Sequence, residues 1–170
     1  MRTVFFVFFL IMLANVFWVP VSSAAPLSSK TPVHISADRF SLDQAKDIGT
    51  YSGNVQVTQG ELRIDGAKLI ILLAKKGGIE HLTMNGAPAR FKDVGKNGKT
   101  IIGQAMEMTY IPSDQRIVLK GKARVEQNGN TFQANRIVYD VQKGSIEAGA
   151  PGQRIEATFT PAHALTRPKQ

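Results

Sequence analysis

The sequence predicts an all-β protein, either an antiparallel sandwich, a barrel or a jelly roll, and three observations support this class. Beyond the N-terminal segment, no stretch keeps the apolar period of 3.6 residues that amphipathic helices require. Turn-forming residues, as in Gln127-Asn128-Gly129, divide strand-like runs at short and regular spacing. A short apolar phrase also recurs along the chain. The length of 170 residues suits one domain with a buried core.

Nine strands are expected between the turns. In several of them apolar and polar residues alternate, as at Tyr51, Gly53, Val55 and Val57, so one face of the strand is apolar. Pairs such as Asn-Gly accept the positive φ angles that tight hairpins need. The expected strands span 33–42, 48–58, 62–73, 79–92, 100–110, 116–126, 131–141, 145–149 and 154–160.

The recurring phrase is the more specific signal of the fold. Each of four copies has an apolar first residue, a small residue two positions later, and apolar residues five and seven positions later. The copies begin at Ile35, Ile64, Ile101 and Phe132. In an unbroken strand the two apolar pairs would face opposite sides, so we expect each copy to bulge or bend near its fourth residue. Those fourth residues are Asp38, Ala67, Gln104 and Asn135.

Three glycines lie on the apolar faces of expected strands, where a tight core would prefer larger side chains. They are Gly53, Gly86 and Gly121. A glycine inside a strand marks a bend, a bulge or the close approach of another group. Curvature alone and a ligand-related role are both open interpretations of these positions.

The N-terminal segment has the layout of a secretory signal. Arg2 precedes an apolar run of 16 residues that ends at Pro20, and Ser22 and Ala24 supply small residues for a cleavage site. We expect residues 1–24 to be a cleaved signal peptide and the protein to be periplasmic. An uncleaved membrane anchor is the alternative, although the run is short for a span of about 20 residues.

The remaining segments have a simple predicted organisation. Residues 25–32, rich in Pro and Ser, are expected to be flexible, and residues 161–170 are expected to be a disordered tail. Residues 33–160 would form the β domain. The chain contains 21 Lys and Arg residues against 13 Asp and Glu, a formal charge of +8, which favours an anionic partner. Export makes nucleic acid an unsuitable candidate.

Several kinds of catalytic and metal site are absent from the sequence. There is no cysteine, which excludes disulfides, thiolate metal sites and cysteine nucleophiles. The three histidines lack the spacing of metal ligands, and neither a nucleophile elbow nor a phosphate-binding loop occurs. The carboxylates Asp65, Glu80, Asp93 and Glu107 are scattered, and each is expected to be solvated. We therefore expect no enzyme activity, no cofactor and no metal.

One segment carries a specific family resemblance. The run Tyr51-Ser-Gly53-Asn54-Val55-Gln-Val57-Thr-Gln59-Gly60, with Pro32–Asp38 before it and Leu62–Leu69 after it, resembles the OstA-like repeat domain. The resemblance covers about residues 32–159. It implies a twisted antiparallel β-jellyroll that is open at its ends. It also implies that an apolar groove inside the jellyroll conducts the lipid A acyl chains of lipopolysaccharide between the inner and outer membranes.

The same resemblance implies how such domains assemble. They stack end to end, with an inner-membrane-anchored LptC-like partner, an outer-membrane LptD-like partner, or further copies of the chain. Unpaired edges at strand 33–42 and at 145–160 would support this, because an exposed edge invites pairing with another chain. Head-to-tail pairing does not close and so extends a filament. Pro112 is a departure from the family pattern, and strand pairing should stop there.

The inward-facing apolar residues are the candidates for binding acyl chains, since each exposed CH₂ costs about 0.8 kcal/mol. Packing of the same residues as a dry core is the alternative. The candidate groove residues are Val33, Ile35, Val55, Ile64, Leu69, Leu82, Met84, Phe91, Met106, Met108, Tyr110, Leu119, Phe132 and Tyr139. Phosphates of the ligand would stay outside, near Lys68, Lys75, Lys76, Arg90, Lys120, Lys122, Arg124 and Arg136.

Two other functions are compatible with the same fold. A membrane-anchored adaptor would result if the N-terminal segment were retained. A passive carbohydrate-binding sandwich is the second alternative. It is disfavoured because sugar platforms expose aromatic rings, and only seven aromatic residues, none of them Trp, follow residue 24.

Overall fold

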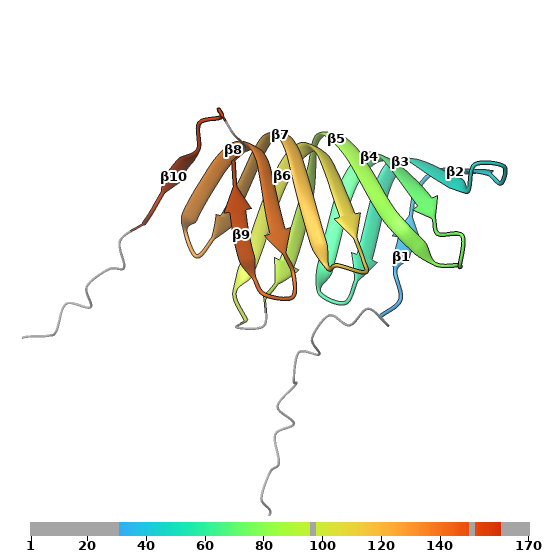
Figure 1. Cartoon of the computed structure of the whole chain (residues 1–170), viewed down its shortest axis with the longest axis horizontal. Helices are drawn as coiled ribbons and strands as arrows, with labels where there is room; N and C mark the ends of the chain where they lie inside the picture. Colours follow the sequence, from blue (N-terminus) through green and yellow to red (C-terminus); the bar gives the residue numbers. More distant parts are fainter. Residues whose placement is uncertain (1–30, 96–97, 150–151, 161–170) are drawn as a thin grey trace, which may run out of the picture.

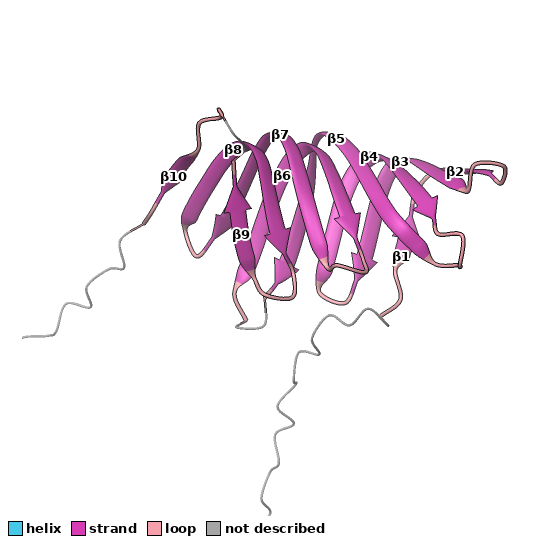
Figure 2. Ribbon diagram, in the orientation of Figure 1, coloured by secondary structure: helices cyan, strands magenta, loops and turns pink. Residues whose placement is uncertain are grey.

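The computed structural model describes residues 31–95, 98–149 and 152–160. The expected signal peptide, nearly all of the expected flexible segment and the expected tail lie outside these residues. Every regular element within the described ranges is a β-strand, as Figure 2 shows. The all-β prediction is confirmed.

The strands form one antiparallel sheet in the described part of the chain (Figure 1). The order is β1-β3-β4-β5-β6-β7-β8-β10, with β2 also beside β3 and β9 beside β8. The strands are β1 (His34–Ser36), β2 (Arg39–Asp43), β3 (Ile48–Gln59), β4 (Leu62–Leu73), β5 (Ile79–Val94), β6 (Thr100–Ile111), β7 (Arg116–Gln127), β8 (Asn130–Asp140), β9 (Ser145–Ala148) and β10 (Glu156–Thr158).

The observed strands match the expected ones closely, except that one expected strand is divided into two. The expected strand 33–42 is split into β1 and β2, which pair with different halves of β3. Pairing between β6 and β7 ends at Ile111 and Arg116, directly before the turn at Pro112. The chain therefore stops its ladder where the proline removes a donor, as predicted.

The sheet is folded into two layers along one line of irregular positions. We call this line the bend; it comprises residues 37–38, 53–54, 66–67, 86–88, 105–106, 121–122 and 135, where the register of each strand pair shifts. The first layer contains segments 39–52, 68–85, 107–120 and 136–148, and the second contains 34–36, 55–65, 89–104, 123–134 and 156–158. Figure 1 shows the long strands passing from one layer to the other.

Positive φ angles form the bend in two of the strands. Gly53 (φ 81°) and Asn54 (φ 46°) in β3 correspond, 68 residues on, to Gly121 (φ 73°) and Lys122 (φ 50°) in β7. Glycine adopts this region without a steric penalty, which explains why a small residue stands at each site. These φ angles show that the two glycines take part in the curvature of the sheet.

The repeat predicts the bend at the fourth or fifth residue of every copy, but it misplaces Met106 in the third. Register shifts occur at Ala67 and Asn135, and the break between β1 and β2 falls at Asp38. In β6 the shift lies between Gln104 and Glu107, so the bend comprises Ala105, the fifth residue of the third copy, and Met106. The inward prediction for Met106 is wrong: its side chain is 44% exposed and lies beside Gly121.

The misplacement arises from a two-residue offset in how the third copy aligns. Gly103, and not Ile101, shares a cross-strand row with Phe91 and Val125, in the position that Ile64 and Phe132 occupy in their copies. Ile101 therefore lies one row farther from the bend, and it is buried there. The apolar pair after the bend in this copy is Met108 and Tyr110.

The two layers pack face to face over a single apolar core. The rings of Phe91 in the second layer and Tyr139 in the first are stacked, with centroids 5.5 Å apart. Gly103 makes room for that pair, because a β-carbon at this position would overlap the ring of Phe91. Close packing of this kind leaves little tolerance for an added methyl group.

We predict that Gly103→Ala lowers the free energy of unfolding by about 1–3 kcal/mol, since the ring of Phe91 must move within a packed core. Urea denaturation of the purified domain measures this. Gly49→Ala is the matched control, because a β-carbon there would lie at ordinary contact distance, 3.5 Å from Phe40. Equal losses in the two variants would contradict the packing argument.

Candidate functional site

The candidate site is the interior between the two layers, which is built from cross-strand rows of apolar side chains. Residues paired directly across an antiparallel sheet share a face, so the pairing register defines each row. One row of the first layer contains Phe40, Tyr51, Leu69, Met84, Met108, Leu119, Ile137 and Ala148. A row of the second layer contains Ile35, Val57, Ile64, Phe91, Gly103, Val125, Phe132 and Ala157.

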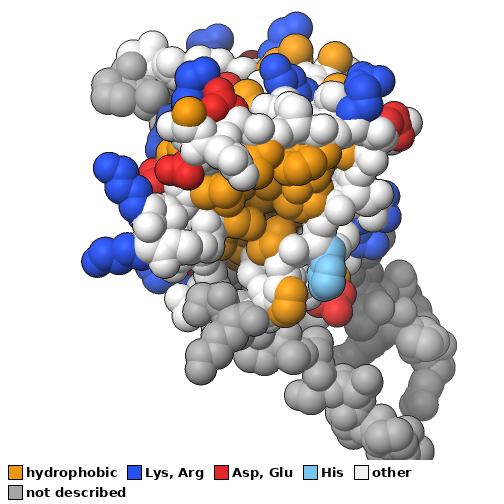
Figure 3. All heavy atoms as spheres, turned by 90° about the vertical axis from the view of Figure 1, so that its right-hand side faces the viewer, with side chains coloured by type: hydrophobic (Ala, Val, Ile, Leu, Met, Phe, Trp, Pro, Cys, Tyr) orange, Lys and Arg blue, Asp and Glu red, His pale blue; other side chains and the backbone are white. Residues whose placement is uncertain are grey.

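These rows extend from one lateral edge of the folded sheet to the other. In the central strands the row members are fully enclosed, as at Leu119 and Val125. At the edge formed by β1 and β2 the same rows end at Phe40, which is 56% exposed, and at half-buried Ile35. Figure 3 views the molecule from this end and shows a recessed patch of hydrophobic side chains framed by polar and charged groups. The interior is therefore open to solvent at this end.

The opposite end has a similar arrangement. Phe132 and Ala134 of β8 and Ile146 of β9 are half-buried against the core. Phe159 packs its ring edge against Phe132, with centroids 5.9 Å apart, and is itself 66% exposed. The inner rows thus end at two apolar edges, because no further strand of the described residues covers either lateral edge.

Thirteen of the fourteen candidate groove residues lie in or against this core; Met106 is the exception. Val33, Ile35 and Phe132 are half-buried near the ends. The rest are fully buried in the centre: Val55, Ile64, Leu69, Leu82, Met84, Phe91, Met108, Tyr110, Leu119 and Tyr139. The central residues pack on one another in this structure, so contact between them and a ligand remains a prediction.

Two hydrogen bonds between buried side chains join the layers on the side of the interior that lies opposite the bend. We call this side the seam. It is flanked in the first layer by the hairpins 43–48, 73–79, 111–116 and 140–145, and in the second by the hairpins 59–62 and 127–130 and by the ends of β5 at Val94 and β6 at Thr100. Tyr110 donates its hydroxyl to Oε1 of Gln59 at 2.7 Å, and Tyr139 donates to Oδ2 of Asp93 at 2.7 Å. Each bond joins one layer to the other.

The environment of these groups keeps the tyrosines protonated as donors. Burial, assisted by the charge of Asp93, raises the pKa of Tyr110 to about 12. Burial and the hydrogen bond to Asp93 also raise the pKa of Tyr139. Desolvation raises the pKa of Asp93, partly opposed by its hydrogen bonds from Tyr139 and the Val94 backbone.

The expectation that Asp93 is solvated is wrong, because this side chain is only 2% exposed. It occupies an inward position near the end of β5, where the partner strand of the opposite layer brings Tyr139 to it. Gln59 was not singled out by sequence reasoning either. The available signal was the tyrosine itself: a buried tyrosine needs a partner for its hydroxyl, and both tyrosines lie near strand ends.

The basic side chains lie on the outer surface, away from the inner rows. Lys68, Arg90, Lys120, Lys122, Arg124 and Arg136 lie within two residues of a bend position, and Lys75 and Lys76 lie in the hairpin between β4 and β5. Lys120 is 3.4 Å from Glu107 across the β6–β7 pair, and Arg124 is 3.8 Å from Glu126. These ion pairs are exposed, so they contribute little to stability.

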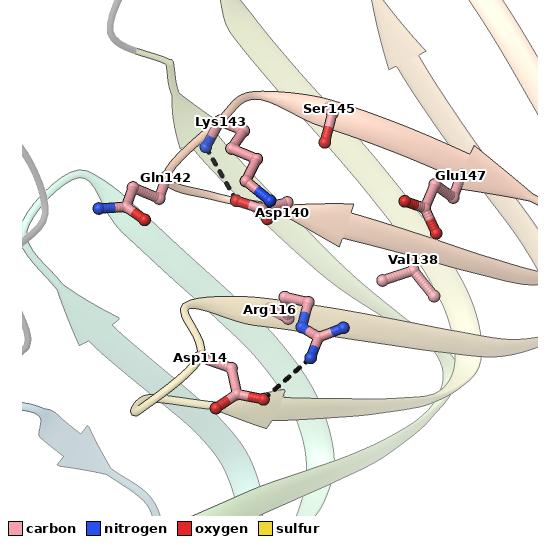
Figure 4. A pocket seen from close by; sticks show the side chains of 8 residues that line it. All are labelled: Asp114, Arg116, Val138, Asp140, Gln142, Lys143, Ser145 and Glu147. Carbon is pink, nitrogen blue, oxygen red and sulfur yellow. Dashed lines mark hydrogen bonds and ion pairs between the residues drawn. The ribbon is translucent and has the colours of Figure 1, made fainter.

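A polar hollow on the outer face of β7, β8 and β9 is unrelated to the interior (Figure 4). Arg116 pairs with Asp114 at 3.0 Å, and Asp140 accepts a hydrogen bond from the Lys143 backbone at 2.8 Å. Its charges of both signs largely satisfy each other. The hollow therefore offers no single charge that a ligand of opposite sign would select.

The described residues hold neither a metal-binding cluster nor a helix that could span a membrane. No group of three or more His, Asp or Glu side chains is placed there to hold a metal ion. Within the same ranges, no helix has the length and apolar character needed to cross a membrane.

The fold and the interior together define a class: an antiparallel jellyroll whose apolar inner face runs between two open ends. Comparison with known proteins gives the family. Residues 34–145 match the model of the LptA/LptD N-terminal domain family of lipopolysaccharide transport proteins. The chain therefore belongs to this family.

Individual relatives agree with that assignment. The chain is 31% identical to the lipopolysaccharide export system protein LptH of Pseudomonas aeruginosa over 149 residues, 86% of this chain and 85% of the relative. It is 32% identical to LptA of Escherichia coli strain K12 over 133 residues, 77% and 72% of the two chains. LptH of Pseudomonas aeruginosa, a periplasmic component of the lipopolysaccharide transport device, also has a crystal structure, which superimposes on this one with a TM-score of 0.72. The two chains are 30% identical in that superposition, which covers 80% of this chain and 100% of LptH.

We predict that the stability of the wild-type protein relative to Asp93→Asn falls as pH rises from about 4. The folded-state pKa of Asp93 lies above its usual value of 3.8, so the folded protein binds this proton more tightly than the unfolded chain does. That stabilisation is complete below the unfolded pKa and is lost as pH rises through the folded pKa. Urea denaturation of both proteins between pH 3.5 and about 7 measures the difference.

Asp114→Asn is a control of opposite sign. Hydrogen bonds from Ser113 and Arg116 hold the pKa of Asp114 below its usual range. The wild type should therefore gain stability over this variant as pH rises, by a small amount because the group is exposed. A stability difference for Asp93→Asn that does not change with pH would contradict the burial argument.

Proposed function

We propose that this protein binds lipopolysaccharide in the periplasm and bridges the inner and outer membranes during its export. The inner apolar rows would hold the lipid A acyl chains while the sugars and phosphates stay in water. The observation that supports this most directly is the continuity of those rows between two open ends, in a chain of the lipopolysaccharide transport family.

The physical reason is the cost of exposing hydrocarbon. Each CH₂ group left in water costs about 0.8 kcal/mol, so several acyl chains cannot cross an aqueous space unsheltered. The flexible side chains of Met84 and Met108 in the inner rows suit chains of variable position. Outward cations such as Lys68 and Arg136 are available to the phosphates. No bond is made or broken, so this is a transport function and not an enzymatic one.

The proposed assembly is head-to-tail through the two lateral edges. β1 and β2 at one edge, and β9 and β10 at the other, each pair on one side only within the described residues. A second strand added at such an edge satisfies backbone groups and covers the exposed ends of the inner rows. The partners would be further copies of the chain, an LptC-like protein at the inner membrane and an LptD-like protein at the outer membrane.

A photocrosslinking amino acid placed at inward and outward positions in living cells tests lipid binding. Substitution at Ile35 and Phe132, which are half-buried at the two ends of an inner row, should give lipopolysaccharide adducts. Substitution at Ile102 and Met106, which are exposed on the outer surface, should give none. Adducts of equal yield from both sets would refute the proposed site.

Analytical ultracentrifugation tests the head-to-tail assembly. We predict that Phe40→Asp shifts the mature protein toward the monomer at concentrations where the wild type associates, because a charge at the exposed end of an inner row opposes its burial by a partner. Ile102→Asp is the matched control, since its side chain is similarly exposed (49% against 56%) but lies on the outer surface. Dissociation in both variants would argue against assembly through this edge.

A further inference from the structure

We propose that lipopolysaccharide enters the interior through the seam, and that the Tyr110–Gln59 and Tyr139–Asp93 hydrogen bonds are the latches that hold the seam closed. This inference rests on the proposed function and adds the route by which the ligand enters. It also gives the two tyrosine hydroxyls, Gln59 and Asp93 a role in transport.

The topology leaves one side of the interior that can open. In the described residues, each of the long strands β3 to β8 passes from one layer to the other at the bend, so backbone continuity closes that side. The opposite side is flanked by hairpins, each of which returns to its own layer. Separating the layers there breaks no strand pairing, whereas separating them at the bend would break the strands themselves.

The shape of lipopolysaccharide also requires an opening at the seam. An acyl chain in the interior is bonded to a large polar head group that must stay in water, so the head group has to project through an opening along the whole path. The open ends admit hydrocarbon only at the lateral edges. Leu119 and Ile117 in the centre are fully buried, so a chain reaches them only when the layers part.

The side chains at the seam are suited to a reversible closure. Near it, the inward positions Gln59 and Asp93 are polar, and they are only 2% exposed. Each accepts a hydroxyl from a tyrosine of the opposite layer at 2.7 Å. Gln59 also donates its amide to the Thr31 carbonyl at 2.8 Å, which holds the acceptor in place. The buried apolar side chains of Leu62 and Ile101 lie in the same row, so the hydrogen bonds act together with apolar packing. Both kinds of side-chain contact open at a lower cost than the backbone ladders of the sheet.

Deleting a latch should increase the rate of ligand uptake. We expect Tyr110→Phe and Tyr139→Phe each to accelerate uptake of fluorescently labelled lipopolysaccharide about fivefold, because a hydrogen bond of about 1 kcal/mol corresponds to that factor. Stopped-flow fluorescence measures the rate. Thr109→Val is the matched control: it removes a hydroxyl contact of 3.3 Å with Thr83 that lies within one layer. Equal rates in all variants and the wild type would overturn the proposal.

A covalent crosslink between the two layers at the seam tests the same proposal, because it should slow uptake where the latch deletions accelerate it. The chain has no cysteine, so Gln59→Cys with Tyr110→Cys introduces two unique thiols, one on each layer. Joining them with a short bismaleimide should slow lipopolysaccharide uptake at least tenfold. The matched control is the same double variant capped with N-ethylmaleimide, whose seam is free. Uptake at the same rate by the tied and capped proteins would show that the ligand enters through the ends.

A ligand-free measurement separates this inference from the proposed function. An Ile117→Cys substitution places a reporter thiol on the buried inner face, and its rate of maleimide labelling reports opening of the interior. Labelling should accelerate in the Tyr110→Phe and Tyr139→Phe backgrounds and not with Thr109→Val. If wild-type protein fails to bind lipopolysaccharide at all, the proposed function is refuted. If binding occurs and neither labelling nor uptake responds to the latches, only the seam is refuted.

Discussion

The arrangement of this molecule depends on the bend that all the long strands share. Because each strand shifts register at the same line, one antiparallel sheet becomes two layers whose inner faces meet. Positive φ angles at Gly53-Asn54 and Gly121-Lys122 produce the turn in two strands without a break in the chain. Without the bend, the same alternating strands would expose their apolar face to water, and there would be no interior to enclose hydrocarbon.

The bend also determines where the interior is weak. In the described residues the strands themselves cross one side and side-chain contacts close the other, so opening the first side costs more than opening the second. Tyr110 and Tyr139 act at the weak side through hydrogen bonds to Gln59 and Asp93. Asp93 is buried, so without the hydrogen bond from Tyr139 its carboxyl group would lack a donor inside the core. Losing this bond would therefore lower the free energy of unfolding.

The lateral edges follow from the same geometry. An open sheet that does not close into a barrel keeps two edges. In the described residues each edge has backbone groups paired on one side only and an exposed aromatic side chain, Phe40 at one end and Phe159 at the other. Such a surface is an aggregation hazard in an isolated domain. In the proposed assembly another domain of the same type would extend the sheet at this edge and continue the apolar rows.

The alternation of Tyr51, Val55 and Val57, the Gly and Asn turns and the four-copy repeat determined the all-β class, the strand boundaries and most of the inward residues. These are local properties, because side-chain alternation and turn chemistry act over a few residues. The position of the bend in β6 was decided by cross-strand pairing, which put Gly103 beside Phe91 and turned Met106 outward. The pairing of Asp93 with Tyr139 joins residues 46 positions apart in different layers. Only the folded sheet brings them together, since no local pattern specifies which inward positions will face each other.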